Sequence, residues 1–190
     1  DRSGYHLILL AKNYRGYKNL IKLVSHAWTE GFYYTPRIDK ELLKRYSEGL
    51  IVSSACIGGE IPKAAIRHGK EQAGKLVQEY KDLFGDDFYL ELQRHPSGDP
   101  LKDKDVFDNE QKANAILLEL AEEYQVKVIA TNDVHFINAE DAEAHDRLIC
   151  LNTGKDLDDP DRMRYTKQEY FKTNEEMARL FSDIPEALDN

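Results

Sequence analysis

The chain has little cysteine and no long apolar run. Its 190 residues include two cysteines, Cys56 and Cys150, which cannot make the disulfide framework of a small secreted domain. We therefore expect reduced thiols in a reducing compartment. No apolar stretch approaches the roughly 20 residues of a membrane-spanning helix, and no basic-then-apolar leader opens the chain. These absences predict a cytosolic protein without a membrane partner.

Positive charge is also scarce. The formal net charge is −9, from 26 Lys and Arg against 35 Asp and Glu. A surface that binds nucleic acid by its phosphates needs clustered Lys and Arg, which the chain as a whole does not offer. From Asp133 to Asp161, nine acidic residues accompany only Arg147 and Lys155. This bias suits cation binding or a basic protein partner, although a solvated acidic face is the simpler interpretation for most of the nine.

The pattern of apolar residues predicts an α/β fold. Hydrophobic residues make up 41% of the chain and charged residues 32%, as in a soluble globular domain. Strand patterns recur about every 40 positions, and helical periodicity follows each of them, which is typical of βα units on a parallel sheet. Four units are too few to close an eight-stranded barrel, so we expect part of a larger domain. The predicted strands cover residues 5–11, 49–54, 88–93 and 126–130.

Helices are predicted wherever apolar residues recur at helical spacing. Asn13 and Asp39 stand where side chains cap the first turn of a helix. Gly58 and Gly59 follow the second strand, where paired glycines permit a tight turn or a close backbone approach. The stretch 96–105 is rich in Pro, Gly and Asp and is predicted to be a surface loop. The predicted helices cover residues 13–28, 39–46, 61–67, 71–84, 110–124, 139–151 and 174–181, with another beginning at 184.

The stretch 126–146 is the first candidate for a functional site. Asp133 and His135 follow the strand 126–130 at its carboxyl end, which is where ligands gather in α/β sheets. A carboxylate and an imidazole two residues apart at that edge suggest a metal. The alternative is that Asp133 caps the next helix and His135 is an ordinary loop residue, since a D-x-H triplet is short and common.

Five blocks, in the same order as in a known family, make the sequence more specific. They are residues 5–13 (YHLILLAKN), 31–39 (GFYYTPRID), 54–56 (SAC), 130–135 (ATNDVH) and 158–160 (DDP). Together they closely resemble the PHP (polymerase and histidinol phosphatase) domain at the amino terminus of bacterial DNA polymerase III alpha subunits, the C-family replicative polymerases. The resemblance covers nearly the whole chain.

The resemblance implies a distorted seven-stranded (β/α) barrel whose rim holds up to three divalent metals through nine ligands. On this chain the family's ligands match His6, Cys56, Asp133 and His135. Imidazole, thiolate and carboxylate groups suit zinc, and also manganese or iron where oxygen ligands dominate. His6 stands near the start of its predicted strand, so its assignment comes from the resemblance and not from barrel geometry. Without the resemblance, Cys56 would equally be a small buried thiol.

The chain lacks part of the family's pattern. The amino-terminal strands that carry the other five ligands would precede Tyr5, so residues 1–152 would be the carboxyl-terminal part of the PHP domain. Residues 153–190 would be a connecting segment leading toward the polymerase palm. The aspartates that hold magnesium for nucleotidyl transfer would lie beyond Asn190, so this fragment alone is expected to be inactive. Three further residues are candidates for supporting the ligands: Glu91, His95 and His145.

Three hypotheses for function remain open. In the first, the parent protein is a DNA-directed DNA polymerase of the bacterial cytoplasm, acting on DNA and deoxynucleotides with a proofreading exonuclease subunit and a sliding clamp. Its PHP domain would hydrolyse phosphoesters, as a 3′–5′ exonuclease does, or support the polymerase structurally. In the second, the chain is a free-standing, metal-dependent PHP phosphatase acting on a small phosphoester. The third hypothesis is a scaffold without catalytic activity.

Overall fold

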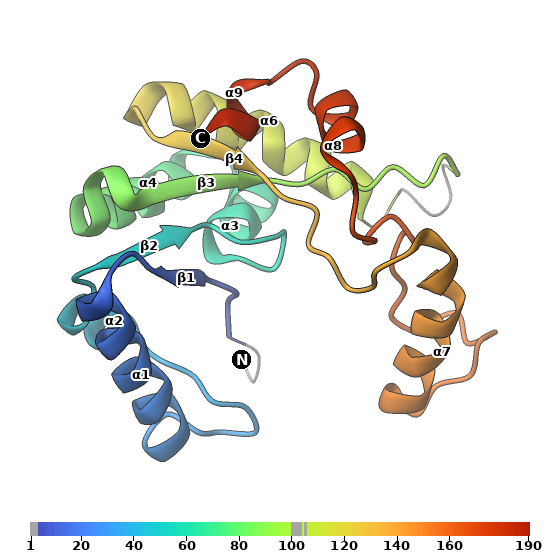
Figure 1. Cartoon of the computed structure of the whole chain (residues 1–190), viewed down its shortest axis with the longest axis horizontal. Helices are drawn as coiled ribbons and strands as arrows, with labels where there is room; N and C mark the ends of the chain where they lie inside the picture. The colour runs from blue at the N-terminus through green and yellow to red at the C-terminus, as the bar shows by residue number, and fades with distance from the viewer. Residues whose placement is uncertain (1–3, 100–103, 105) are drawn as a thin grey trace. The chain divides into compact units, whose positions relative to one another are not determined.

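A computed structural model describes residues 4–99, 104 and 106–190 of the protein. It is a mixed α/β fold in which the four strands form one sheet in the order β1-β2-β3-β4 (Figure 1). All four predicted strands are confirmed, although each is shorter than its pattern suggested. Their bounds are β1 (Ile8–Ala11), β2 (Leu50–Ser53), β3 (Phe88–Leu92) and β4 (Lys127–Ala130).

The sheet is not all parallel, so the predicted parallel arrangement is wrong at its first strand. β1 pairs antiparallel with β2, with Ile8 opposite Ser53, whereas β2 pairs parallel with β3. The N–H of Lys12, just after β1, donates to the carbonyl of Gly49, just before β2, at 2.8 Å. The chain therefore re-enters the sheet at the end where it left. Two helices lie between these strands, so the connection runs out and back instead of making one crossover.

The predicted helices are confirmed with small shifts at their ends. The Asn13 side chain accepts from the Gly16 N–H at 3.0 Å, and the Asp39 side chain accepts from the Leu42 N–H at 2.8 Å, as the cap predictions require. The helices are α1 (Tyr14–Thr29), α2 (Lys40–Arg45), α3 (Glu60–His68), α4 (Lys70–Phe84), α6 (Phe107–Tyr124), α7 (Ala142–Thr153), α8 (Asn174–Leu180) and α9 (Glu186–Asp189), with 3₁₀ turns η1 (Gly85–Asp87) and η2 (Ala139–Asp141).

The core lies on the middle strands and not on β1. Val52 and Leu90 are fully buried, and Phe88 is buried against the ring of Tyr80, with ring centroids 5.5 Å apart. β1 is exposed at three of its four positions because it forms the edge of the sheet. Burial of the side chains on β2 and β3, worth about 1.5–3 kcal/mol for each large one, stabilises β2, the strand that precedes Cys56, beside β3.

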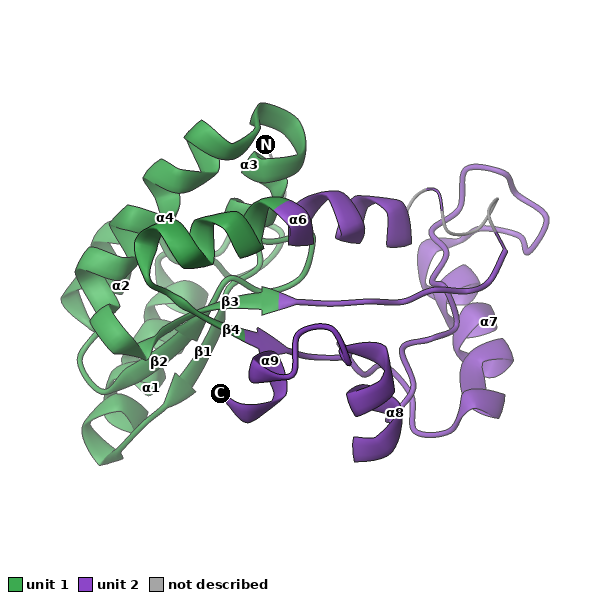
Figure 2. Ribbon diagram, turned by 90° about the horizontal axis from the view of Figure 1, so that it is seen from above, with its two compact units in different colours: residues 1–91, 116–128 green, residues 92–115, 129–190 purple. Residues whose placement is uncertain are grey.

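The chain divides into two compact units (Figure 2). Unit 1 comprises Asp1–Glu91 and Ile116–Val128, and unit 2 comprises Leu92–Ala115 and Ile129–Asn190. The predicted domain boundary after residue 152 stays a prediction, and the segment that follows it belongs to unit 2. Of the predicted loop 96–105, residues 100–103 and 105 lie outside the described residues. Within the described residues, no helix has both the length and the apolar composition to cross a membrane.

Candidate metal centre

In unit 1, two predicted ligands lie together. The Nδ1 atom of His6 is 3.3 Å from the Sγ atom of Cys56, although the residues are 50 positions apart in the sequence. His6 is exposed and Cys56 is half-buried, and both cysteines of the chain are present as thiols, as predicted. The prediction that these two residues meet at one edge of the sheet is therefore confirmed for this pair.

The antiparallel pairing of β1 with β2 explains why His6 lies there. Because the strands run in opposite directions, the start of β1 lies beside the carboxyl end of β2. Before β1 begins, His6 makes a separate parallel bridge to Gly59 in the turn after β2, and its N–H donates to the carbonyl of Gly58 at 3.1 Å. In a parallel sheet, a residue near the start of a strand lies at the edge opposite the ligands. In this mixed sheet the same position places His6 at the edge where β2 ends and Cys56 follows.

The turn after β2 is built to bring Cys56 toward His6. Ala55 has a φ of 59°, a left-handed conformation that costs a non-glycine residue roughly 1–3 kcal/mol. A Cβ atom on Gly58 would come 2.8 Å from Nδ1 of His6, and one on Gly59 would come 2.1 Å from the carbonyl oxygen of Ser54. The predicted role of the paired glycines is confirmed, because a larger residue would displace the His6 ring at position 58 and the turn backbone at position 59.

Glu91 supports the same turn from β3. Its buried carboxylate accepts the Ser53 hydroxyl at 2.5 Å, and its backbone N–H donates to the Ser54 hydroxyl oxygen at 2.9 Å. These bonds hold the last residues of β2 before Cys56. The structure thus gives Glu91 a structural role consistent with its prediction as a residue that supports the ligands.

In unit 2, Asp133 and His135 form the second pair. Asp133 has a φ of 40°, so the chain turns sharply after β4, and its side chain is exposed. The Nδ1 atom of His135 is 2.5 Å from the backbone carbonyl oxygen of Asp133, an atom that can only accept a hydrogen bond. Nδ1 is therefore the donor in this contact, and Nε2 is the ring nitrogen that is left to face a metal. Nε2 lies 3.0 Å from the hydroxyl of Tyr165.

The segment 165–171 holds this loop on one side. The N–H groups of His135 and Phe136 donate to the carbonyl oxygen of Glu169 at 2.8 and 3.4 Å, and the Asn132 amide donates to the carbonyls of Gln168 and Tyr170 at 3.0 and 2.7 Å. These backbone contacts make the segment after α7 a neighbour of the candidate ligands.

His95 holds the loop on the other side and is not available as a ligand. It is 2% exposed, and its Nδ1 and Nε2 atoms lie 2.5 Å from Glu110 Oε1 and 3.0 Å from the Asn132 carbonyl oxygen. Burial by itself lowers the pKa of His95, but the hydrogen bond and charge of Glu110 outweigh it, so the pKa is raised above its ordinary value.

His145, on α7, lies next to His135. Its ring centroid is 5.7 Å from that of His135, 5.2 Å from that of Phe136 and 5.1 Å from that of Tyr165. It therefore packs the candidate ligand instead of hydrogen-bonding to it. Three of the nine acidic residues between Asp133 and Asp161 form ion pairs, which the interpretation as a solvated acidic face did not include. Asp146 pairs with Arg162, Glu143 with Lys167 and Asp159 with Lys155.

The residues of each pair fit a metal. Tetrahedral zinc with a nitrogen and a sulfur ligand would place those atoms about 3.5 Å apart, close to the separation of His6 and Cys56. A ligating histidine usually donates its other N–H to a carbonyl or carboxylate, as His135 does. Across the part of the chain that the structure describes, no group of three or more His, Cys, Asp or Glu side chains is arranged to hold a metal. Each pair alone is therefore an incomplete site, and convergence of the two pairs stays a prediction.

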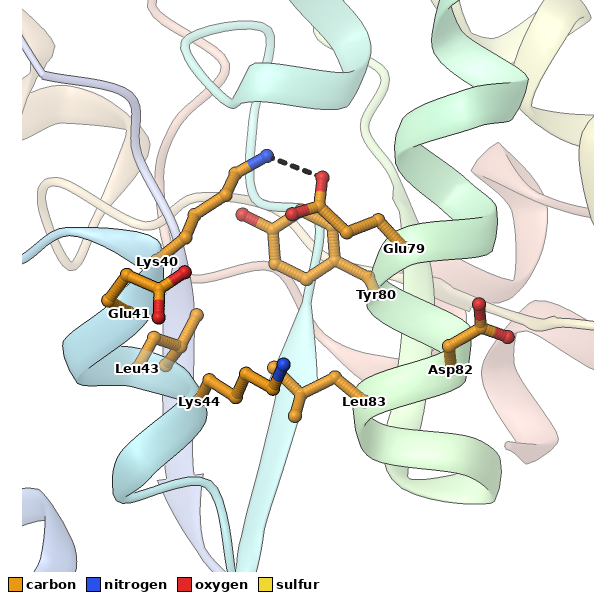
Figure 3. A pocket seen from close by; sticks show the side chains of 8 residues that line it. All are labelled: Lys40, Glu41, Leu43, Lys44, Glu79, Tyr80, Asp82 and Leu83. Carbon is orange, nitrogen blue, oxygen red and sulfur yellow. Dashed lines mark hydrogen bonds and ion pairs between the residues drawn. The ribbon is translucent and has the colours of Figure 1, made fainter.

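A cavity of about 320 Å³ between α2 and α4 gives no second candidate (Figure 3). Nζ of Lys40, which points toward Glu79, binds its carboxylate at 2.7 Å and that of Glu60 at 3.0 Å. Tyr80 donates its hydroxyl to Glu60 at 3.2 Å, and burial followed by the charge of Glu60 raises the pKa of Tyr80. Lys40 is thus engaged by two carboxylates, which makes this a structural ion cluster.

Sequence reasoning missed Tyr165, Asn132, Glu110 and Glu169. Asn132 adjoins the D-x-H triplet, and its amide is the kind of group that clamps a loop. Glu110 and Glu169 are buried carboxylates, which a sequence pattern presents as ordinary surface residues. No local signal in the sequence links Glu110 to His95, since the partners come from a helix and from the end of a strand.

The comparisons with known proteins agree with the motifs. The family described as "PHP domain" matches residues 1–95, half of the chain. The chain is 48% identical over 190 residues to the DNA polymerase III subunit alpha of Borreliella burgdorferi, covering 100% of the chain and 16% of that protein. The corresponding subunit of Campylobacter jejuni is 43% identical over 201 residues (100% and 16%), and that of Thermus aquaticus 40% over 188 residues (98% and 14%). The chain thus spans about a sixth of the length of these relatives, and it belongs to the PHP domain family.

Proposed function

We propose that this chain is part of the PHP domain of a bacterial replicative DNA polymerase, in which it contributes ligands to a divalent metal centre. The observation that carries the proposal is the likeness of the entire chain to DNA polymerase III subunits alpha at 40–48% identity. The parent protein would be a DNA-directed DNA polymerase of the cytoplasm that acts on DNA and deoxynucleotides. A proofreading exonuclease subunit and a sliding clamp are the partners proposed with it.

The apolar stripe along α1 supports membership in a larger protein. Its side chains recur at spacings of three and four residues, and each is 48–70% exposed. A contiguous apolar face of this kind usually marks an interaction surface, and a free-standing phosphatase would have no reason to expose it. The stripe consists of Tyr14, Tyr17, Ile21, Val24 and Trp28.

In the proposed centre, His6, Cys56, Asp133 and His135 hold zinc or manganese together with further ligands of the intact domain. A bound divalent ion would activate water for phosphoester hydrolysis, or stabilise the fold by binding the native state. We favour structural support, because two of the cations after α7 are already engaged: Lys167 pairs with Glu143 and Arg162 with Asp146. Such a surface offers little to hold a DNA end. Magnesium for nucleotidyl transfer would be held in the separate polymerase domain.

The test uses the full-length parent protein and its His135→Ala variant. Nucleotide incorporation, 3′ cleavage and thermal melting are each measured with zinc, with manganese and with a chelator. If the metal is structural, the variant melts at a lower temperature and incorporates nucleotides less efficiently. If the centre is hydrolytic, cleavage disappears while melting and incorporation stay unchanged, which would overturn the structural proposal. A parent protein that incorporates no nucleotide would refute the polymerase proposal.

A further inference from the structure

We propose that His95 and Glu110 form a positioning pair for the candidate ligands Asp133 and His135, acting through the backbone carbonyl of Asn132. This inference rests on the proposed metal centre. Neither residue of the pair would touch the metal. Their role would be to fix the direction in which the loop after β4 presents its two ligands.

Three hydrogen bonds join the pair to each other and to the loop. Nδ1 of His95 contacts Glu110 Oε1 at 2.5 Å, and the backbone N–H of His95 donates to Oε2 of the same carboxylate at 2.8 Å. On the opposite side of the ring, Nε2 donates to the carbonyl oxygen of Asn132 at 3.0 Å. His95 and Glu110 are each 2% exposed, so water cannot substitute for either contact at low cost.

The Asn132 carbonyl is the atom through which the direction of Asp133 can be controlled. It belongs to the peptide plane that precedes Asp133, and the rotation between that plane and the Asp133 Cα atom is the left-handed φ of 40°. A residue in this region of conformational space persists only where its surroundings hold it. The bond from His95 holds the plane, and the Glu169 carbonyl holds the loop again at the His135 N–H, at 2.8 Å.

The chemistry of histidine suits this position. Both ring nitrogens face acceptors, one a carboxylate and the other a carbonyl, so His95 bridges α6 and the loop with two donors at fixed angles. Because both nitrogens are occupied, His95 is excluded as a ligand of this arrangement. Supporting contacts of this kind commonly change metal affinity by about 10–100-fold.

The test compares two double variants of the full-length protein, His95→Gln/Glu110→Gln and His95→Asn/Glu110→Gln. The glutamine amide reaches the place of Nε2 and keeps the donor to Asn132, whereas the asparagine amide reaches the place of Nδ1 and keeps the contact with residue 110. Both lack the buried charges, so they differ in the bond to the loop. We expect the asparagine variant to bind zinc at least about tenfold more weakly than the glutamine variant. In metal-free protein, its amides at 133–136 should also exchange faster.

Equal zinc affinity and equal amide exchange in the two variants would overturn the inference, whatever their melting temperatures. If either variant fails to fold, Glu110→Gln is compared with Asp183→Asn, which breaks the Arg94 ion pair beside His95 without touching Asn132. Zinc binding that is weaker in Glu110→Gln but not in Asp183→Asn supports the inference, and equal zinc binding in the two variants refutes it. A wild-type protein that takes up no zinc would refute the proposed metal centre, while the exchange comparison would still decide whether the pair holds the loop.

Discussion

Replacing Gly58 by alanine should separate His6 from its place beside Cys56. An added Cβ atom would come 2.8 Å from His6 Nδ1, whereas ordinary contacts begin at 3.4 Å, so the ring must retreat by about 0.6 Å. Metal ligands tolerate deviations of about 0.2 Å from their ideal distances. The ring displacement is therefore about three times the tolerance, and we expect a loss of zinc affinity of about tenfold or more, or roughly 1.4 kcal/mol.

Stability should change much less than affinity. Alanine lowers the conformational entropy of the unfolded chain, which favours the native state by about 0.4–1 kcal/mol. The displacement of a partly exposed ring opposes this gain. Gly4→Ala is the matched control, because position 4 is two residues before His6 in the sequence. Its added Cβ would lie at an ordinary contact distance, 3.5 Å, from the nearest atom, the Cδ of Arg37. The assay is zinc competition with a chromogenic chelator in the full-length protein, combined with thermal melting. Unchanged affinity in Gly58→Ala would refute the argument that this close approach positions His6.

Three further predictions concern stability and metal content. The pKa of His95 is raised in the fold, so its pairing with Glu110 stabilises the protein fully below about pH 6.5, and this contribution is lost as pH rises through the folded-state pKa. Denaturant unfolding at a series of pH values should therefore show a free energy of unfolding that falls over this range in wild type and not in Glu110→Gln. Phe88→Ala removes a fully buried ring that packs on Tyr80 and should cost about 3–5 kcal/mol in a denaturant titration, and a loss below about 1 kcal/mol would contradict the assigned core. The isolated 190-residue chain should bind zinc or manganese weakly or not at all, because each pair of candidate ligands alone is an incomplete site, and stoichiometric, tight metal by elemental analysis would contradict this.

The sequence was sufficient for the elements and their caps, but not for the direction of β1. Asn13 and Asp39 cap their helices through local contacts, which a local pattern can predict. Whether β1 runs parallel or antiparallel to β2 depends on the path of the two helices between them, and periodicity carries no information on that path. The family resemblance identified His6 correctly as a neighbour of Cys56, while the strand argument pointed away from it.

The support around the ligands was predicted least well. His95 was expected near Asp133, and it is there, but its partner Glu110 lies on a helix that periodicity describes as amphipathic and nothing more. Tyr165 and Glu169 come from a stretch with faded periodicity, which was expected to be a connection. Their contacts with His135 depend on where the chain folds back, which no spacing in the sequence encodes.

The central claim is that His6, Cys56, Asp133 and His135 contribute to one metal centre in the intact domain. The most direct test measures bound zinc and manganese in the full-length protein under a fixed concentration of competing chelator, for wild type and for Cys56→Ser, His135→Ala and Cys150→Ser. The two ligand variants should each lose metal, whereas Cys150→Ser, which alters the second thiol of the chain, on α7, should keep it. Metal retained by both Cys56→Ser and His135→Ala, or lost equally in Cys150→Ser, would contradict the claim.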